Sequence, residues 1–317
     1  MLRCARLCRL LVVCLLLLGA GPSWASTIDN FSPGRHNRFA SGGYAGSAVL
    51  NPNAFFAAYD FSGIGRTGAN PVTMITPVHG LAAAHYAPAG TVTFVNAFGA
   101  LVTRQVASTQ QIQDGSNGNA DTDLLFVTLD APLSGGDEVA TYNLTFPTGR
   151  DPQAGTLSSL GQAEILVYGN QHAVGRNEID GSEHAGLFDF GYVSVGSSLA
   201  AAAIFDFDPI TGFSPDESKL VSGDSGHPDF ISHGGELSLF GIHWAVGTAS
   251  DNTPINISTF APYYWSELNT LVGNYNVANG TSYQFGLTDV LASIPEPTTA
   301  LLLTLGLTGL GMRRRTR

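Results

Sequence analysis

A serine between two glycines, directly after an aspartate, is the feature of this chain most suited to chemistry. The segment reads V-S-G-D-S-G-H-P-D-F and centres on Ser225. A serine hydroxyl is a poor nucleophile at neutral pH unless a base removes its proton and donors wait for the oxyanion. The flanking glycines allow the backbone to turn sharply, so that N–H groups can point into a site. The segment therefore predicts a nucleophilic serine, served by a base and an acid elsewhere in the chain.

A histidine and an aspartate upstream supply those partners. His85 lies in I-T-P-V-H-G-L-A-A-A-H-Y, and Asp123 begins D-L-L-F-V-T-L-D-A-P. We expect His85 to act as general base and then general acid, and Asp123 to fix the imidazole tautomer and stabilise the imidazolium. His79 is a rival base six residues before His85. Asp121 is a rival acid two residues before Asp123, on the same face if the strand extends that far.

These segments resemble those of the trypsin/chymotrypsin-like serine peptidase family, in which histidine, aspartate and serine follow one another in this order. L-A-A-A-H-Y is similar to the family's "LTAAHC", and Leu129 and Pro132 fall at the offsets of its "DIALLKL..P" strand. The family's "GDSGGP" is matched from Gly223 to Pro228, with His227 in place of a glycine. The resemblance covers roughly residues 40–275 and implies a serine peptidase without a cofactor or a metal ion.

The resemblance also implies roles for residues around the serine. The backbone N–H groups of Gly223 and Ser225 would form the oxyanion hole. Lys219 stands six residues before Ser225, where the family has the floor of its specificity pocket, and a lysine there would favour acidic substrate side chains.

Two residues depart from the family pattern. In the family, the carboxylate at the position of Asp224 pairs with a new N-terminus after zymogen cleavage, but no I-V-G-G-like segment is present near the start of this chain. Either activation differs, or Asp224 finds another partner such as Arg35 or Arg38. His227 places a side chain where the family has none, so it either crowds the loop or faces outward.

The elements that must position these residues are strands. Short apolar runs such as T-V-T-F-V-N, L-L-F-V-T-L and E-I-L-V-Y-G alternate with turn residues, and helical periodicity occurs only near 260–272. The pattern predicts an all-β chain, and the resemblance implies two packed antiparallel six-stranded β-barrels with a short C-terminal helix. We expect a domain over 26–275, with lobes at about 40–145 and 146–260, and a loosely ordered linker over 276–294. Residues 26–39 are also expected to be loosely ordered.

Both ends of the chain carry targeting signals. Residues 1–25 have three arginines, an apolar run and a small-x-small end, which predict a secretory signal peptide; all three cysteines lie inside it. Residues 295–317 carry Pro-Glu-Pro, an apolar stretch and a basic tail, and resemble the PEP-CTERM sorting signal. That resemblance implies a sortase-like membrane peptidase as partner and a transient anchor in the inner membrane. A plain C-terminal anchor is the alternative.

Charge narrows the range of partners. Without the two end segments the chain keeps 24 acidic and 7 basic residues, and Lys219 is its only lysine. Phosphate binding needs clustered lysine and arginine, so we expect no nucleic acid partner, and membrane contact only through the C-terminal segment. We expect an exported serine endopeptidase of protein or peptide substrates, located outside the cell or in its envelope. A catalytically weak or inactive matrix or adhesion protein of the same fold is the alternative, and an esterase is a third possibility.

Overall fold

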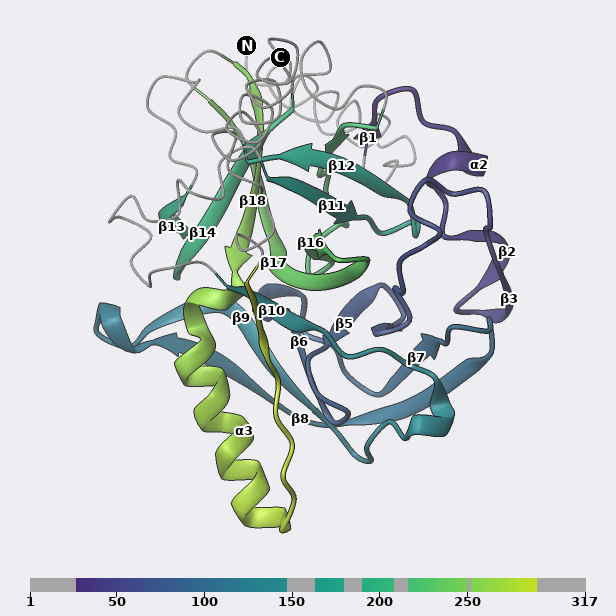
Figure 1. Ribbon diagram of the computed structural model, residues 1–317. Coiled ribbons are helices and arrows are strands. Elements are labelled where there is room, and N and C mark those ends of the chain that lie inside the picture. Colours follow the sequence, from purple (N-terminus) through teal and green to yellow (C-terminus); the bar gives the residue numbers. More distant parts are fainter. Residues whose placement is uncertain (1–26, 147–162, 180–189, 208–215, 250–251, 290–317) are drawn as a thin grey trace, which may run out of the picture.

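The computed structural model describes residues 27–146, 163–179, 190–207, 216–249 and 252–289. Over these residues the chain is built from strands, with one long helix and a few short helical turns (Figure 1). The predicted all-β class, with two packed lobes and a short C-terminal helix, is confirmed. The predicted signal peptide and sorting segment lie outside the described residues. None of the helices that the structure describes is long and apolar enough to span a membrane.

The first lobe is a closed barrel of six antiparallel strands, in the order β4-β5-β6-β9-β8-β7. Its interior is filled by apolar side chains such as Val72, Leu125 and Val127. The strands and the helical turns attached to them are β4 (Ile64–Thr67), β5 (Asn70–Met74), β6 (His79–Ala83), η1 (Ala84–Tyr86), β7 (Thr91–Val95), β8 (Leu101–Asp114), η2 (Gly115–Asn117), β9 (Ala120–Leu129) and η3 (Gly135–Asp137).

The second lobe is a nine-stranded sheet, which follows the order β12-β11-β16-β17-β18-β14-β13 with β10 and β19 attached. Across the described residues this path does not close, and β10 pairs in parallel with β17 and β19, so the lobe differs in detail from a closed antiparallel barrel. Its strands are β10 (Asn143–Phe146), β11 (Glu164–Tyr168), β12 (Val174–Glu178), β13 (Phe190–Val195), β14 (Ser198–Asp206), β16 (Pro228–His233), β17 (Glu236–Thr248), β18 (Pro254–Phe260) and β19 (Leu287–Asp289).

The N-terminal segment is more ordered than predicted. β1 (Thr27–Ile28) pairs with β15 (Ser218–Lys219), and β2 (Phe39–Gly43) pairs with β3 (Gly46–Leu50). Between them, α2 (Pro33–His36) carries Arg35, which forms a two-pronged ion pair with Asp216 at 2.5 and 2.6 Å. The expectation of a loose flank was therefore wrong for residues 27–39, because burial of Ile28 and His36 holds this segment against the second lobe.

The C-terminal segment is also more ordered than predicted. A helical turn, η6 (Ala261–Tyr264), leads into α3 (Trp265–Asn279), which extends past the expected end at residue 272 and stops at Gly280 in the left-handed conformation. Figure 1 shows α3 lying along the first lobe, where it contacts β8. β19 then pairs with β10. The predicted loose linker over 276–294 was thus wrong for residues 276–279 and 287–289.

One of the hydrophobic clusters spans both lobes. A single cluster of buried side chains includes Leu81 and Leu124 from the first barrel together with Leu239 and Ile242 from the second sheet. Because apolar side chains of both lobes pack in one dense cluster, neither can shift without disturbing the other. The lobes therefore form a rigid frame for groups placed where they meet.

Candidate active site

The structure brings His85, Asp123 and Ser225 together where the lobes meet. The His85 Nδ1 lies 2.7 Å from the Asp123 Oδ2, and its Nε2 lies 2.9 Å from the Ser225 Oγ. The backbone N–H of His85 also donates to the Asp123 Oδ1 at 3.0 Å. Asp123 therefore holds the histidine at two points, and the ring can donate from Nδ1 while Nε2 accepts the serine proton.

Each of the three residues comes from a different element. β6 and β9 are neighbours in the barrel, with Ala83 opposite Leu124, so the turn η1 after β6 places His85 beside Asp123 in β9. Ser225 comes from the loop between β15 and β16 in the other lobe. A Cβ on Gly226 would lie 3.1 Å from the Pro71 Cγ and 3.4 Å from the Ala83 N, and Gly226 has φ +80°. Glycine thus lets the serine loop approach the first barrel closely.

Burial gives the three groups different electrostatic surroundings. Asp123 is 1% exposed, whereas the side chain of His85 is 43% exposed. The hydrogen bond from Asp123 raises the pKa of His85 above its ordinary value; burial opposes this shift, and the Asp123 charge adds to it. A base with a raised pKa takes up the serine proton more readily.

The two rival residues lie elsewhere. His79 is fully buried in the first barrel, with its Nδ1 2.8 Å from the Thr76 Oγ1 and its ring stacked on Phe126. Burial lowers the pKa of His79 to about 4, so it stays neutral at neutral pH. Asp121 is exposed and accepts a hydrogen bond from the side chain of Gln113. Neither is placed beside Ser225, in keeping with the preference for His85 and Asp123.

The loop before Ser225 presents two backbone N–H groups without partners. Gly223 has φ +104°, a conformation that favours glycine. Among the described residues, neither the Gly223 N–H nor the Ser225 N–H donates a hydrogen bond. Such free donors next to a nucleophile are what an oxyanion requires. They are the same two amides that the sequence resemblance assigns to the oxyanion hole.

Asp224 is held by backbone amides. Its Oδ1 accepts a hydrogen bond from the Asn170 N–H at 2.9 Å, and its Oδ2 accepts one from the Val221 N–H at 2.8 Å. The suggestion of Arg35 or Arg38 as its partner is not supported. Arg35 pairs with Asp216, and Arg38 donates to the hydroxyl of Tyr44 and to the carbonyl of Val95.

His227 turns inward rather than crowding the site. Its side chain is fully buried, its Nδ1 lies 3.0 Å from the Asp224 carbonyl oxygen, and its ring stacks on Tyr168. Burial, with a contribution from the positive charge of Arg66, lowers the pKa of His227 well below its ordinary value. The departure from the family's glycine thus places a neutral, buried ring beneath the loop.

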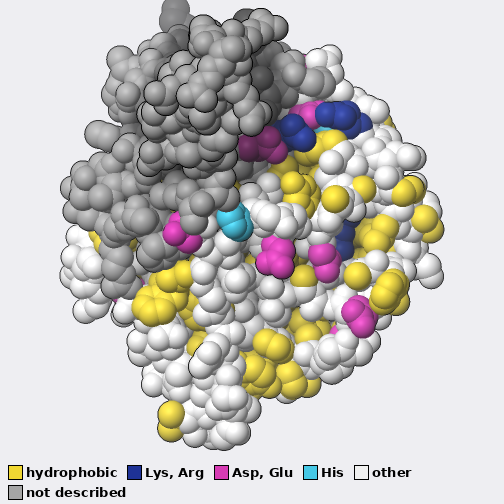
Figure 2. All heavy atoms as spheres, viewed as in Figure 1, with side chains coloured by type: hydrophobic (Ala, Val, Ile, Leu, Met, Phe, Trp, Pro, Cys, Tyr) yellow, Lys and Arg dark blue, Asp and Glu magenta, His cyan; other side chains and the backbone are white. Residues whose placement is uncertain are grey.

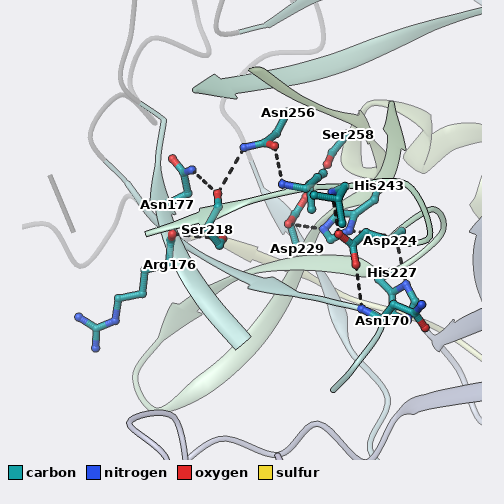
Figure 3. Close-up of polar contacts among 12 residues, drawn as sticks. Asn170, Arg176, Asn177, Ser218, Asp224, His227, Asp229, His243, Asn256 and Ser258 are labelled. Atoms are coloured by element: carbon teal, nitrogen blue, oxygen red, sulfur yellow. Dashed lines mark hydrogen bonds and ion pairs between the residues drawn. The ribbon is translucent and has the colours of Figure 1, made fainter. Parts of the chain in front are cut away.

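A second histidine and aspartate, which the sequence analysis did not predict as a pair, lie behind the same loop (Figure 3). His243 in β17 contacts Asp229 in β16 at 2.7 Å, and both are buried. Ser258 in β18 donates to the other oxygen of Asp229 at 2.5 Å. The available signal was the presence of Asp229 and His243 within otherwise apolar strands, since buried charges in proteins are almost always paired.

Lys219 lies in β15, opposite Thr27 of β1. The strand on either side of it is held by two asparagines, as Figure 3 shows: Asn177 donates to the Ser218 carbonyl, and Leu220 donates its N–H to the Asn256 Oδ1. Lys219 is partly buried, and its ammonium has no hydrogen bond or ion pair within the part of the chain that the structure describes.

The surface agrees with the acidic composition. On the face drawn in Figure 2, acidic side chains are scattered among polar and apolar ones, and basic side chains gather near α2. Arg35 of α2 and Arg176 of β12 both approach Asp216, at 2.5 and 3.7 Å, so these cations are paired. The described residues include no group of three or more histidine, cysteine or acidic side chains arranged to hold a metal ion.

Comparison with known proteins identifies the C-terminal segment. Residues 293–315 match the family model of the PEP-CTERM protein-sorting motif, which confirms the sorting signal predicted at the C-terminus. No curated protein sequence matches the chain. Among solved structures, the chain is similar to kallikrein-related peptidase 10, with 16% sequence identity and a TM-score of 0.40 over 64% of this chain and 89% of that chain.

Proposed function

We propose that this protein is an exported serine endopeptidase in which Ser225 is the nucleophile, His85 the general base and Asp123 the residue that orients it. The observation that carries the proposal is the continuous chain of contacts from Asp123 to His85 at 2.7 Å and from His85 to Ser225 at 2.9 Å. Two segments of the first lobe and one of the second must come together to form this series of contacts. A serine that served only as a turn residue between strands would need no such histidine and aspartate beside it.

The mechanism follows from the placement of the protons. The Ser225 hydroxyl attacks the substrate carbonyl carbon as the His85 Nε2 takes its proton. The His85 Nδ1 keeps its own proton and donates it in a hydrogen bond to Asp123, which stabilises the imidazolium. The oxyanion that forms accepts hydrogen bonds from the Gly223 and Ser225 N–H groups. The imidazolium then protonates the leaving amine. Water attacks the acyl-enzyme in the reverse sense and releases the serine, so no cofactor is needed.

Lys219 is proposed to select substrates. A partly buried lysine six residues before Ser225 would attract an acidic substrate side chain, as a residue at that position does in the family that the sequence resembles. The chain has more acidic than basic residues, and Lys219 is its only lysine.

The sorting motif at residues 293–315 indicates export and sorting to the cell envelope. We propose that residues 1–25 are removed as a signal peptide, that the C-terminal segment anchors the protein transiently in the inner membrane, and that a membrane peptidase cleaves near Pro295. Sequencing both termini of the secreted form tests this proposal. A mature form that retains residues 296–317 would contradict cleavage of the tail.

Covalent labelling tests the activity. The purified chain without its end segments should react with a fluorophosphonate probe, and Ser225→Ala or His85→Ala should abolish the reaction. Ser116→Ala, in a helical turn of the first lobe, serves as the control and should label like the wild type. If a folded wild-type chain does not label, the peptidase proposal fails and the non-catalytic matrix or adhesion role becomes the better one. Comparison of peptide and ester substrates separates a peptidase from an esterase.

A further inference from the structure

The buried pair of His243 and Asp229 lies directly behind the serine loop. His243 is 1% exposed and Asp229 is 0% exposed, and their side chains meet at 2.7 Å between the His243 Nε2 and the Asp229 Oδ1. The Ser258 hydroxyl donates to the Asp229 Oδ2. A carboxyl group this deeply buried needs such hydrogen-bond partners. The two side chains thus form a buried ion-pair contact inside the second sheet, and they have no part in the proton transfers assigned above.

Both ring nitrogens of His243 face acceptors. The Nε2 faces a carboxylate oxygen, and the Nδ1 lies 3.2 Å from the carbonyl oxygen of Asp224. An imidazole ring satisfies two acceptors only when both nitrogens carry protons. Burial by itself lowers the pKa of His243. The charges of Asp229 and Asp224 and their hydrogen bonds together outweigh burial, so the pKa of His243 lies above its ordinary value. Geometry and electrostatics thus agree on an imidazolium.

The carbonyl of Asp224 is the point on which these donors converge. Besides the His243 Nδ1, it accepts from the backbone N–H of His227 at 3.1 Å and from the His227 Nδ1 at 3.0 Å. His227 is neutral, so it must carry its proton on Nδ1 to donate to this carbonyl. Three donors on one carbonyl hold its direction firmly, and a charged donor is the strongest kind.

This carbonyl belongs to the same peptide group as the Ser225 N–H. In a trans peptide the C=O and the N–H point in opposite directions within one plane. Because the Asp224 carbonyl accepts hydrogen bonds from the buried histidines, the Ser225 N–H must point away from these histidines. The direction of one oxyanion donor is therefore set by what the carbonyl of Asp224 binds.

We infer that His243, kept protonated by Asp229, is a positioning residue that orients the Asp224–Ser225 peptide group so that the Ser225 N–H faces the oxyanion. This inference deepens the proposed function and rests on it. It also explains why buried charges occupy the core of this lobe, where apolar side chains would pack without cost of desolvation.

Two substitutions at His243 separate this role from a structural one. Asparagine can place an amide N–H near the position of the histidine Nδ1, and glutamine near that of Nε2. His243→Gln should keep the contact with Asp229 but lose the donor to the Asp224 carbonyl, whereas His243→Asn should do the reverse. The measurements are the inactivation rate constant and the binding constant for a fluorophosphonate probe, together with the thermal unfolding midpoint.

We expect His243→Gln to lower the inactivation rate constant roughly ten- to hundredfold. Complete loss of an oxyanion donor typically costs ~10²–10³-fold, and a misdirected donor should cost no more than a missing one. The binding constant should not change, because the oxyanion forms only in the transition state. His243→Asn should react about tenfold faster than His243→Gln even if both lose similar stability. Equal inactivation rate constants in the two variants would overturn the inference, and so would rate constants that change only in proportion to the loss of stability.

The failures of the two proposals are distinguishable. A wild-type chain that does not label contradicts the proposed function, and this inference falls with it. A wild-type chain that labels, alongside a His243→Gln variant of equal rate, contradicts the inference alone. If neither variant folds, the nitrogen-15 spectrum of wild-type His243 at pH 7 decides: two protonated ring nitrogens support the inference, and a single one overturns it.

Discussion

The carboxylate of Asp224 accepts a hydrogen bond from the backbone N–H of Asn170 at 2.9 Å. Asn170 is itself held from the other lobe, because Arg66 of β4 donates to its side-chain Oδ1 at 2.6 Å and to its carbonyl at 3.0 Å. The Val221 N–H binds the second carboxylate oxygen. The serine loop is therefore anchored through backbone amides that are present in the intact chain.

This arrangement makes Asp224→Asn a sensitive change. One carboxylate oxygen becomes an NH₂ group facing an N–H donor, so we expect a loss of about 1–3 kcal/mol in the free energy of unfolding and slower labelling. Chemical denaturation and labelling rates measure the two effects.

An N-terminal extension before Thr27 serves as the companion experiment. Because backbone amides already bind Asp224, the extension should leave the labelling rate unchanged. A rate that depends on a free N-terminus would show that the loop needs a further partner.

Asp123→Asn should slow labelling by about 10⁴-fold, because the asparagine amide favours the wrong tautomer of His85. Asp121→Asn is the matched control: Asp121 lies two residues away in the same strand, is exposed and contacts Gln113, so its loss should leave the rate near that of the wild type. Labelling time courses check both variants. A larger effect at Asp121 than at Asp123 would contradict the assignment.

The pH dependence of labelling should report the raised pKa of His85. The base acts in its neutral form, so the rate falls as the pH decreases through this pKa, and the midpoint should lie above the ordinary value of 6.5. The Asp123→Asn variant loses the main cause of the shift, and its midpoint should move to lower pH. Rate profiles of the two proteins decide the matter, and coincident midpoints would show that Asp123 does not set this pKa.

Gly226→Ala should separate the serine loop from the first barrel. The new Cβ would meet Pro71 at 3.1 Å in a backbone with φ +80°, so we expect a stability loss of about 1–3 kcal/mol. Displacing the Ser225 hydroxyl by about 1 Å should slow labelling ~10²-fold. Gly234→Ala is the control, since Gly234 has φ +60° with open space around it. Gly234→Ala should lose stability but label at the wild-type rate. If labelling slows equally in Gly226→Ala and Gly234→Ala, backbone strain and not the contact with Pro71 is the cause.

Replacing the lysine proposed as the specificity residue should change which peptides are cut. Lys219→Ala should reduce the preference for acidic side chains before the cleaved bond, by on the order of fivefold for a partly exposed ion pair. Lys219→Arg keeps the charge and should keep the preference. Profiling with a peptide library measures both variants, and an unchanged profile in Lys219→Ala would place the specificity elsewhere.

The sequence by itself determined the parts that depend on local pattern. Short apolar runs between turn residues identified the strands, because alternation and β-branched residues describe a pleated, half-buried surface. Three motifs in a known order singled out His85, Asp123 and Ser225, which the structure brings within hydrogen-bond distance. The sorting motif at the C-terminus could likewise be predicted from the sequence, since it consists of contiguous residues.

Only the tertiary structure decided which partners meet across long loops. Asn170 reaches Asp224 from 54 residues away, and His243 reaches Asp229 across a strand pair with a bulge that shifts the register. The inward rotation of His227 and the order of residues 27–39 and 276–279 depend in the same way on packing against distant segments. Such contacts are set by the burial of whole strands, which no short stretch of sequence encodes, because the hydrogen bonds of a buried polar group go to whichever donors the packed sheet places beside it.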